Sequence, residues 1–248
     1  VYHECKQGDA AMYAKFETFP VWNLPLKHPV NIAYEAATLD LKDFNLIDPF
    51  HLESEGAAAI NYNRDVESFP ILQAILKRIT GSRQIYRSPT EMGVNRVGFA
   101  IVNDDAAREA AKQEIVYRYF RTSCEYMMGV ADVESLNKAE LLLREVGITP
   151  EYRPVVTPAR RTVTEAAERL GAEDGVADGL TICGAALELP SGKIVTGKNS
   201  PLLHAATAAI INGLKTLAGV PDEIHLLSPL VIESIAGFKR EIGGGKNP

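Results

Sequence analysis

The first hundred residues of this 248-residue chain have a different texture from the rest. They are irregular and rich in proline, asparagine and aromatic residues. Pro20 and Pro25 exclude a helix or a central strand between them, because proline lacks the backbone N–H that both structures need. From residue 104 on, apolar residues recur at helical spacing between helix-capping residues. This contrast predicts an α/β protein, a mixture of helices and strands, divided into distinct parts.

We expect three such parts. Residues 1–103 form an irregular α/β region that completes a larger domain. Residues 104–172 form a helical subdomain, in which the segments Asp105–Met128 and Asp132–Val146 pack as an antiparallel pair because a short turn joins them. Residues 180–248 form a C-terminal α/β subdomain.

The C-terminal subdomain contains a predicted β-hairpin. Strands at 181–189 and 193–198 flank the turn residues Pro190-Ser191-Gly192. An apolar helix at 202–218, a short strand at 223–227 and a helix beginning at Ser228 follow. This β-β-α-β-α order resembles the topology of cytidine deaminases.

Two chemical motifs in this subdomain are incomplete. Residues 192–198 have the GxxxxGK spacing of a phosphate-binding loop, but Asn199 replaces the Ser or Thr that binds magnesium, and the hairpin is the favoured interpretation. His204 begins a helix as a deaminase zinc ligand does, yet the H-x-E and P-C-x-x-C patterns are missing. A zinc site needs three protein ligands and only His204 is present, so we expect no zinc here and single out no metal-binding residues.

Composition excludes several classes of protein. The net charge of -6 and pI near 5.5 argue against nucleic-acid binding, and the short apolar runs argue against a membrane span. Cys5, Cys124 and Cys183 are far apart and form no CxxC motif, which favours the cytoplasm. The chain begins with Val1 and ends with Pro248, and we interpret it as a fragment.

The segment from Asp48 to Glu55 carries the candidate catalytic residue, His51. An aspartate, a histidine and two glutamates lie within eight residues, and a histidine among carboxylates is suited to acid–base chemistry. The alternative is a solvated turn with a capping aspartate.

Four candidate ligand-binding residues follow a predicted buried strand at 57–62. Ligands of α/β proteins bind at strand ends, and Arg64 can hold a carboxylate or phosphate with two hydrogen bonds. The alternative is that Arg64 pairs on the surface with Asp65 or Glu67. The four are Asn61, Asn63, Arg64 and Asp65.

Four further ligand-binding candidates lie elsewhere in the first hundred residues. Lys15 belongs to a predicted strand at 12–17, whereas the other three lie in a polar loop that could equally be a connector built from local turns. These candidates are Lys15, Ser88, Thr90 and Asn95.

Several polar strings in this order resemble uncharacterised protein family 0371, a bacterial group of unknown function. One example is Asp48-Pro49-Phe50-His51-Leu52-Glu53. The resemblance covers nearly the whole chain: the segments are 13–20, 22–31, 48–53, 61–65, 88–90, 92–95, 186–190, 194–198 and 225–229.

The resemblance implies a longer protein. Members are about twice this length, with a Rossmann-like N-terminal half whose glycine-rich loop would supply a nucleotide site that this chain lacks. It also implies a helical subdomain and a C-terminal subdomain of deaminase-like topology. The family has no established catalytic residues to transfer.

Two functional hypotheses remain open. In the first, the chain is the ligand-binding and catalytic portion of a larger cytoplasmic enzyme that acts on a small polar or phosphorylated metabolite. In the second, it is a non-catalytic scaffold or oligomerisation module. Under both we expect a homo-oligomer that contacts the missing N-terminal half. Convergence of the polar segments on one cleft would favour the enzyme.

Overall fold

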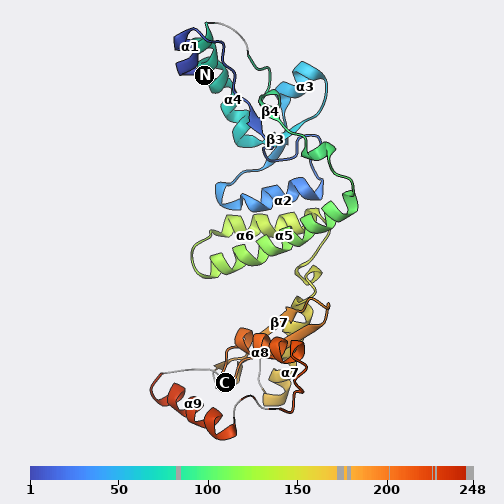
Figure 1. The fold of residues 1–248 in the computed structure, drawn as a ribbon, viewed down its shortest axis with the longest axis vertical. Helices are drawn as coiled ribbons and strands as arrows, with labels where there is room; N and C mark the ends of the chain where they lie inside the picture. Colours follow the sequence, from blue (N-terminus) through green and yellow to red (C-terminus); the bar gives the residue numbers. More distant parts are fainter. Residues whose placement is uncertain are drawn as a thin grey trace. The chain divides into compact units, whose positions relative to one another are not determined.

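The computed structural model describes residues 1–81, 85–171, 176–177, 180–200, 202–224, 226 and 228–243. The chain folds into two compact units, unit 1 (Val1–Pro150) and unit 2 (Glu151–Pro248) (Figure 1). Helices predominate, and the described strands pair into two-stranded sheets, which confirms a mixed α/β protein. Within the described ranges, no helix is long and apolar enough to cross a membrane.

Unit 1 combines helices with two small sheets. Strand β1 pairs in parallel with β4, and β2 pairs in antiparallel fashion with β3. The strands are β1 (Lys15–Phe16), β2 (Asn45–Ile47), β3 (Ile60–Tyr62) and β4 (Gly93–Val94). The α-helices are α1 (Tyr2–Gln7), α2 (Pro29–Ala37), α3 (Pro49–Glu55), α4 (Asn63–Thr80), α5 (Asp104–Met127) and α6 (Val133–Glu145). Short 3₁₀ turns lie at η1 (Leu39–Leu41), η2 (Thr90–Met92) and η3 (Val97–Phe99), and η4 (Pro150–Tyr152) crosses the unit boundary.

The helices α5 and α6 form the predicted hairpin, and α2 packs against both (Figure 1). Ile115, Val116 and Leu142 are almost completely buried on the inner faces. Asp132 caps α6 by accepting a 2.7 Å hydrogen bond from the N–H of Ser135, as its position before the apolar repeat predicts.

The proline-rich loop before α2 is held by one buried side chain, Asn31. Its Oδ1 accepts a 2.9 Å hydrogen bond from the N–H of Val21, and its Nδ2 donates to the carbonyls of Val21 and Pro25. The loop cannot satisfy these groups through regular secondary structure, so the asparagine amide does so instead. Pro29 occupies the first turn of α2 as expected.

Unit 2 is built around the predicted hairpin, with β7 (Gly184–Glu188) antiparallel to β8 (Ile194–Lys198). Residues 192–198 therefore form the turn end and β8. Helices α7 (Val156–Leu170) and α8 (Ala205–Leu217) both pack on the hairpin, and α9 (Pro229–Glu241) follows. A further short pair joins β5 (Val176–Ala177) to β6 (Leu180–Thr181).

The hairpin and its helices approach very closely. A Cβ atom on Gly197 would lie 2.2 Å from the backbone nitrogen of Ala209 in α8, and one on Gly184 would lie 2.4 Å from the carbonyl oxygen of Ala159 in α7. Only glycine fits at both positions. Helix α7, grouped with the helical subdomain in the sequence analysis, thus belongs to unit 2. The strand expected at 223–227 includes residues 225 and 227, outside the described ranges, and stays a prediction.

Candidate functional site

The centre of the candidate site is the carboxylate of Asp48, which is completely buried in unit 1. It is the N-cap of α3, and its Oδ1 accepts hydrogen bonds from the N–H groups of Phe50 (3.0 Å) and His51 (3.2 Å). The segment therefore contains a capping aspartate, as the alternative interpretation proposed. The cap is buried rather than solvated.

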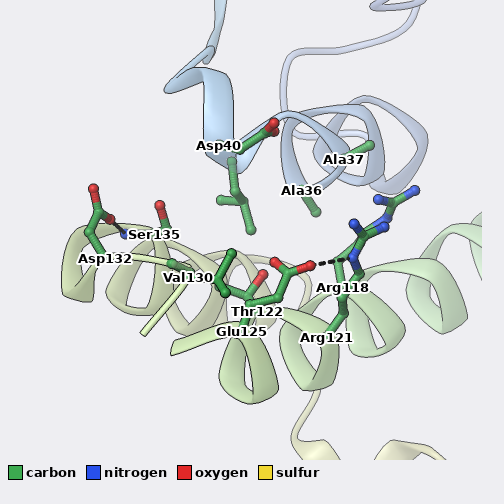
Figure 2. Close-up of a pocket in the computed structure, with 12 residues that line it drawn as sticks. Ala36, Ala37, Asp40, Arg118, Arg121, Thr122, Glu125, Val130, Asp132 and Ser135 are labelled. Carbon is green, nitrogen blue, oxygen red and sulfur yellow. Dashed lines mark hydrogen bonds and ion pairs between the residues drawn. The ribbon is translucent and has the colours of Figure 1, made fainter. Parts of the chain in front are cut away.

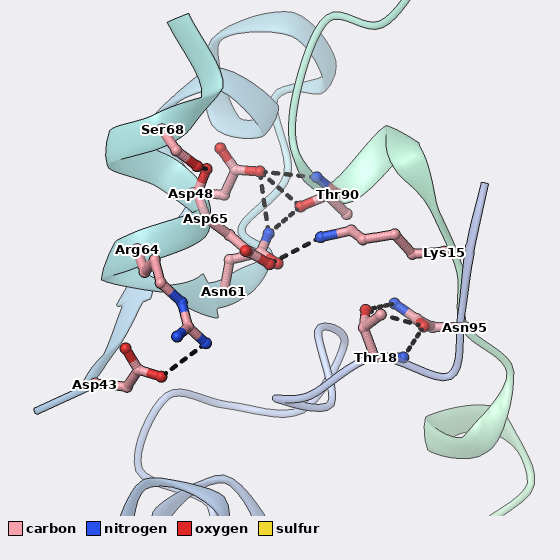
Figure 3. A network of polar contacts seen from close by, with 10 residues as sticks. All are labelled: Lys15, Thr18, Asp43, Asp48, Asn61, Arg64, Asp65, Ser68, Thr90 and Asn95. Atoms are coloured by element: carbon pink, nitrogen blue, oxygen red, sulfur yellow. Dashed lines mark hydrogen bonds and ion pairs between the residues drawn. The ribbon is translucent and has the colours of Figure 1, made fainter. Parts of the chain in front are cut away.

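The other oxygen of Asp48 joins two distant segments, as Figure 3 shows. Its Oδ2 accepts hydrogen bonds from the Asn61 amide (3.2 Å) and from both the N–H (3.2 Å) and the hydroxyl (2.7 Å) of Thr90. The Asn61 amide also donates to the Thr90 hydroxyl at 2.6 Å. We call these three residues the Asp48 network. Since their polar atoms satisfy one another, the network positions the surrounding segments.

His51 lies beside this network, on α3. Its ring Nδ1 is 3.5 Å from the hydroxyl of the fully buried Ser88, and its ring contacts Trp22 edge to face at a centroid distance of 5.9 Å. The Ser88 hydroxyl also accepts a 3.0 Å hydrogen bond from the N–H of Glu91. A partly exposed imidazole next to a hydroxyl can exchange a proton with a bound molecule.

Lys15 and Asp65 form an ion pair close to the Asp48 network (Figure 3). The Lys15 ammonium donates a 2.8 Å hydrogen bond to Asp65 Oδ2, and both side chains keep some contact with solvent, at 20% and 32% exposure. Two predicted residues from segments fifty positions apart therefore meet. Lys15 stands on β1 and Asp65 in the first turn of α4.

Arg64 points to a different partner from those considered in the sequence analysis. Its Nη2 lies 3.0 Å from Oδ2 of Asp43, an ion-pair distance, and the Asp43 side chain is only 3% exposed. The surface pairing of Arg64 with Asp65 or Glu67 was therefore the wrong alternative. Asp43 was not predicted as a partner, because nothing in the sequence around this aspartate, which follows Lys42, indicates that its side chain is buried.

Two predicted residues brace the backbone around the site. The side-chain oxygen of Asn63 accepts a 3.0 Å hydrogen bond from the N–H of Phe44, and that of Asn95 accepts a 2.9 Å hydrogen bond from the N–H of Thr18. Glu17, also missed, accepts hydrogen bonds from the N–H groups of Arg96 and Val97. The contacts of Asn95 and Glu17 join the chain just after β1 to the loop after β4, and Figure 3 shows the one between Thr18 and Asn95.

The acidic and histidine side chains of the site do not gather into a metal site in the part of the chain that the structure describes, where no group of three or more metal-ligating residues occurs. The described chemistry is therefore that of amide, hydroxyl, imidazole, ammonium and guanidinium groups.

Two family models match the chain. The model for "Domain of unknown function DUF1846, N-terminal" matches residues 1–147, and the model for its C-terminal counterpart matches residues 151–248. The chain belongs to the DUF1846 family. The boundary between the two matches coincides with the boundary between units 1 and 2.

Proteins similar in sequence to this chain occur in Clostridium botulinum. The UPF0371 proteins of strains Alaska E43 and Eklund 17B are each 52% identical over all 248 residues, and that of strain ATCC 19397 is 50% identical over 246 residues. These matches confirm the resemblance to family 0371. The chain spans about half the length of these DUF1846 relatives, 48% in each case.

Proposed function

We propose that unit 1 forms the ligand-binding region of a larger cytoplasmic enzyme that acts on a small polar or phosphorylated metabolite. The observation that supports this most is the Asp48 network. It draws together segments near residues 48, 61 and 90, next to the Lys15–Asp65 ion pair. A buried hydrogen-bond network of this kind can hold reactive side chains in fixed positions.

The charges near the network suit an anionic group. Lys15 and Arg64 carry positive charge, and helix α4 begins at Asn63 without a side-chain cap from Tyr62. An 18-residue helix presents unsatisfied N–H groups and a partial positive charge at this end. A phosphate or carboxylate would meet the helix N-terminus and both cations, with Asp65 keeping Lys15 oriented.

In this proposal His51 is the acid–base group and Ser88 orients its ring. Asn61, Thr90, Asn63 and Asn95 hold the surrounding backbone. A nucleotide, if the reaction uses one, binds to the part of the longer relatives that this chain does not span. For unit 2 we propose a zinc-free, cytidine deaminase-like topology, on the basis of the hairpin followed by α8.

The experiment is a thermal-shift comparison on the 248-residue chain with matched pairs of ligands. Glucose 6-phosphate is compared with glucose, AMP with adenosine, and phosphoserine with serine. We expect at least one phosphorylated member to raise the melting temperature by about 2–5 °C more than its partner, because it binds only the folded state.

Two variants locate the binding. Lys15→Ala and Arg64→Ala should each remove most of that shift, whereas Lys77→Ala, which removes an exposed cation from the far end of the same helix, should leave it unchanged. The proposal fails if no phosphorylated member stabilises the protein. It also fails if the Lys15 and Arg64 variants respond like the wild type.

A second candidate function, homo-oligomerisation or docking of the rest of the longer protein, rests on unit 2. Helix α8 exposes Ile210, Leu214 and Leu217 at helical spacing, each more than half exposed. Large apolar surfaces of this kind mark protein interfaces. Light scattering should show an oligomer that forms in a concentration-dependent way. Leu214→Glu should dissociate this oligomer, whereas the control substitution Leu170→Glu, at an exposed position on α7, should not. A monomer at every concentration would exclude the oligomer.

A further inference from the structure

A cavity of about 420 Å³ lies in unit 1, where α2 and η1 face α5 and α6 (Figure 2). Its wall contains none of the residues of the Asp48 network, and no residue of this wall was a candidate in the sequence analysis. The volume falls within the usual range for small-molecule sites. The cavity therefore raises a question separate from the proposed function.

The wall carries charges of both signs on an apolar floor. Arg118, Arg121 and Glu125 come from α5, Asp132 from the cap of α6, and Asp40 from η1. Ala36, Leu39 and Val130 supply apolar surface. Figure 2 shows the two arginines together at one side, and Asp132 at the other.

The arginines keep hydrogen-bond donors available. Nε of Arg118 donates to Glu114 at 2.7 Å, and Nε of Arg121 donates to Glu125 at 2.7 Å. No described residue accepts a hydrogen bond from the terminal nitrogens of either guanidinium. Each guanidinium has five N–H groups, so four on each remain for a ligand. Two adjacent guanidinium groups favour a carboxylate or phosphate between them.

The opposite side of the wall favours a cation. Asp132 shares the Lys42 ammonium with Glu134, at 3.4 Å and 2.7 Å. Asp40 makes no hydrogen bond or ion pair with the residues that the structure describes, although its charge helps to raise the pKa of Arg121. Three carboxylates against two guanidinium groups would repel a simple anion, and the arginines would repel a simple cation. A molecule with both charges satisfies both sides.

A threonine hydroxyl lies between the two sides (Figure 2). Thr122 lines the cavity, and its hydroxyl makes no hydrogen bond with the described residues. A hydroxyl both donates and accepts hydrogen bonds, so a ligand in the cavity can use it in either way.

We propose that this cavity binds a small zwitterion, with its carboxylate or phosphate at Arg118 and Arg121, its amino group at Asp40, and Thr122 between them. The site is independent of the Asp48 network.

The test measures binding to the whole 248-residue chain by isothermal titration calorimetry. The probes are 4-aminobutanoate, 6-aminohexanoate and O-phosphoethanolamine, and the singly charged controls are butanoate, hexanoate and butylamine. We expect at least one zwitterion to bind about tenfold more tightly than every singly charged control, because each control leaves one side of the wall unpaired.

Variants assign the two ends. Arg121→Gln should weaken binding of the zwitterion about tenfold, and Asp40→Asn should abolish the preference for the amino group. Both side chains are exposed enough for the fold to tolerate the change, which circular dichroism verifies. Arg144→Gln is the matched control, since Arg144 forms the same kind of i,i+4 pair, with Glu140, outside the cavity.

Equal affinity for zwitterions and singly charged controls, or unchanged binding in Arg121→Gln, overturns the proposal. Neither result bears on the proposed function, which depends on Lys15 and Arg64. Conversely, the absence of a phosphate-dependent thermal shift would not count against zwitterion binding in the cavity.

Discussion

Units 1 and 2 are stabilised by different means. Apart from Asn199, every buried polar side chain in the described residues belongs to unit 1, among them Asn31, Asp48 and Ser88. Unit 2 combines a small apolar core at Ala166 and Ile182 with close backbone contact at glycine, as between Gly197 and Ala209. On α8, Ile210, Leu214 and Leu217 are exposed.

The difference shows which unit is built to hold a site. Buried polar networks are costly unless every group is satisfied, and they fix the segments that they join in one arrangement. Close packing of small residues holds helices against a sheet, but it places no polar or reactive side chains at a site. A unit that exposes leucines and isoleucines is suited to contact another surface.

The largest test of this contrast is Asp48→Ala. The substitution leaves the N–H groups of Phe50, His51 and Thr90 and the amide of Asn61 without their acceptor. Unsatisfied buried donors cost about 1–3 kcal/mol each, with partial relaxation, so we expect a loss of about 3–5 kcal/mol in the free energy of unfolding. Urea denaturation followed by the fluorescence of Trp22, the single tryptophan, measures it.

Asp132→Ala is the matched control, because Asp132 also caps a helix of unit 1 but is half exposed. Water can replace its carboxylate, and a cost of about 1 kcal/mol is typical of a lost cap. Equal losses in the two variants would show that Asp48 acts only as a cap, and the contrast between the units would lose its main support.

The corresponding test in unit 2 is Gly197→Ala. The new methyl group would meet backbone atoms of α8, at 2.2 Å from the nitrogen of Ala209 and 2.7 Å from the oxygen of Ala205. Backbone atoms cannot move aside as the end of a flexible side chain can, so we expect the free energy of unfolding to fall by about 1–3 kcal/mol. Faster amide hydrogen exchange in β7 and β8, with an unchanged Trp22 transition, would locate the damage in unit 2.

Gly237→Ala provides the control. Gly237 lies in α9, and a Cβ atom there meets nothing within 4 Å. Replacing a helical glycine by alanine usually stabilises by up to about 1 kcal/mol. If the amide hydrogens of β7 and β8 exchanged as slowly in Gly197→Ala as in Gly237→Ala, close packing would not be what stabilises unit 2.

The elements that the sequence predicted well depend on local signals. Asp132 before an apolar repeat, Gly171 after another and Pro190-Ser191-Gly192 between two apolar runs each specify their own structure. The predicted strand at 12–17 shows the limit of this reasoning. Only Lys15–Phe16 forms a strand, because the partner strand, Gly93–Val94, is itself only two residues long.

The candidate site was predictable in composition but not in geometry. Polar residues at 48, 61, 88 and 90 stand out in the sequence, yet the burial of Asp48 depends on Thr90 arriving from 42 positions away. Arg64 could not be assigned to Asp43 because that contact follows from the antiparallel pairing of β2 with β3. Long-range pairing is the information that a single sequence does not display.

The smallest expected effect concerns Tyr62, whose hydroxyl donates a 3.1 Å hydrogen bond to the carbonyl of Tyr34 inside unit 1. Burial raises the pKa of Tyr62 to about 12, since the charged phenolate is disfavoured away from water. The absorbance at 295 nm of the wild type minus that of Tyr62→Phe should therefore show one group titrating near pH 12. In urea the same group should titrate near its ordinary value of about 10.

The sign of the pKa shift also fixes a stability effect. The folded state keeps the Tyr62 proton to higher pH than the unfolded state, so its stabilising contribution is complete below about pH 10 and declines as the pH rises toward 12. The stability difference between the wild type and Tyr62→Phe should shrink over that interval. If the difference titration of the folded protein were instead centred near pH 10, water would reach the Tyr62 hydroxyl in the interior of unit 1. Water could then satisfy the buried polar groups of unit 1 in place of protein partners.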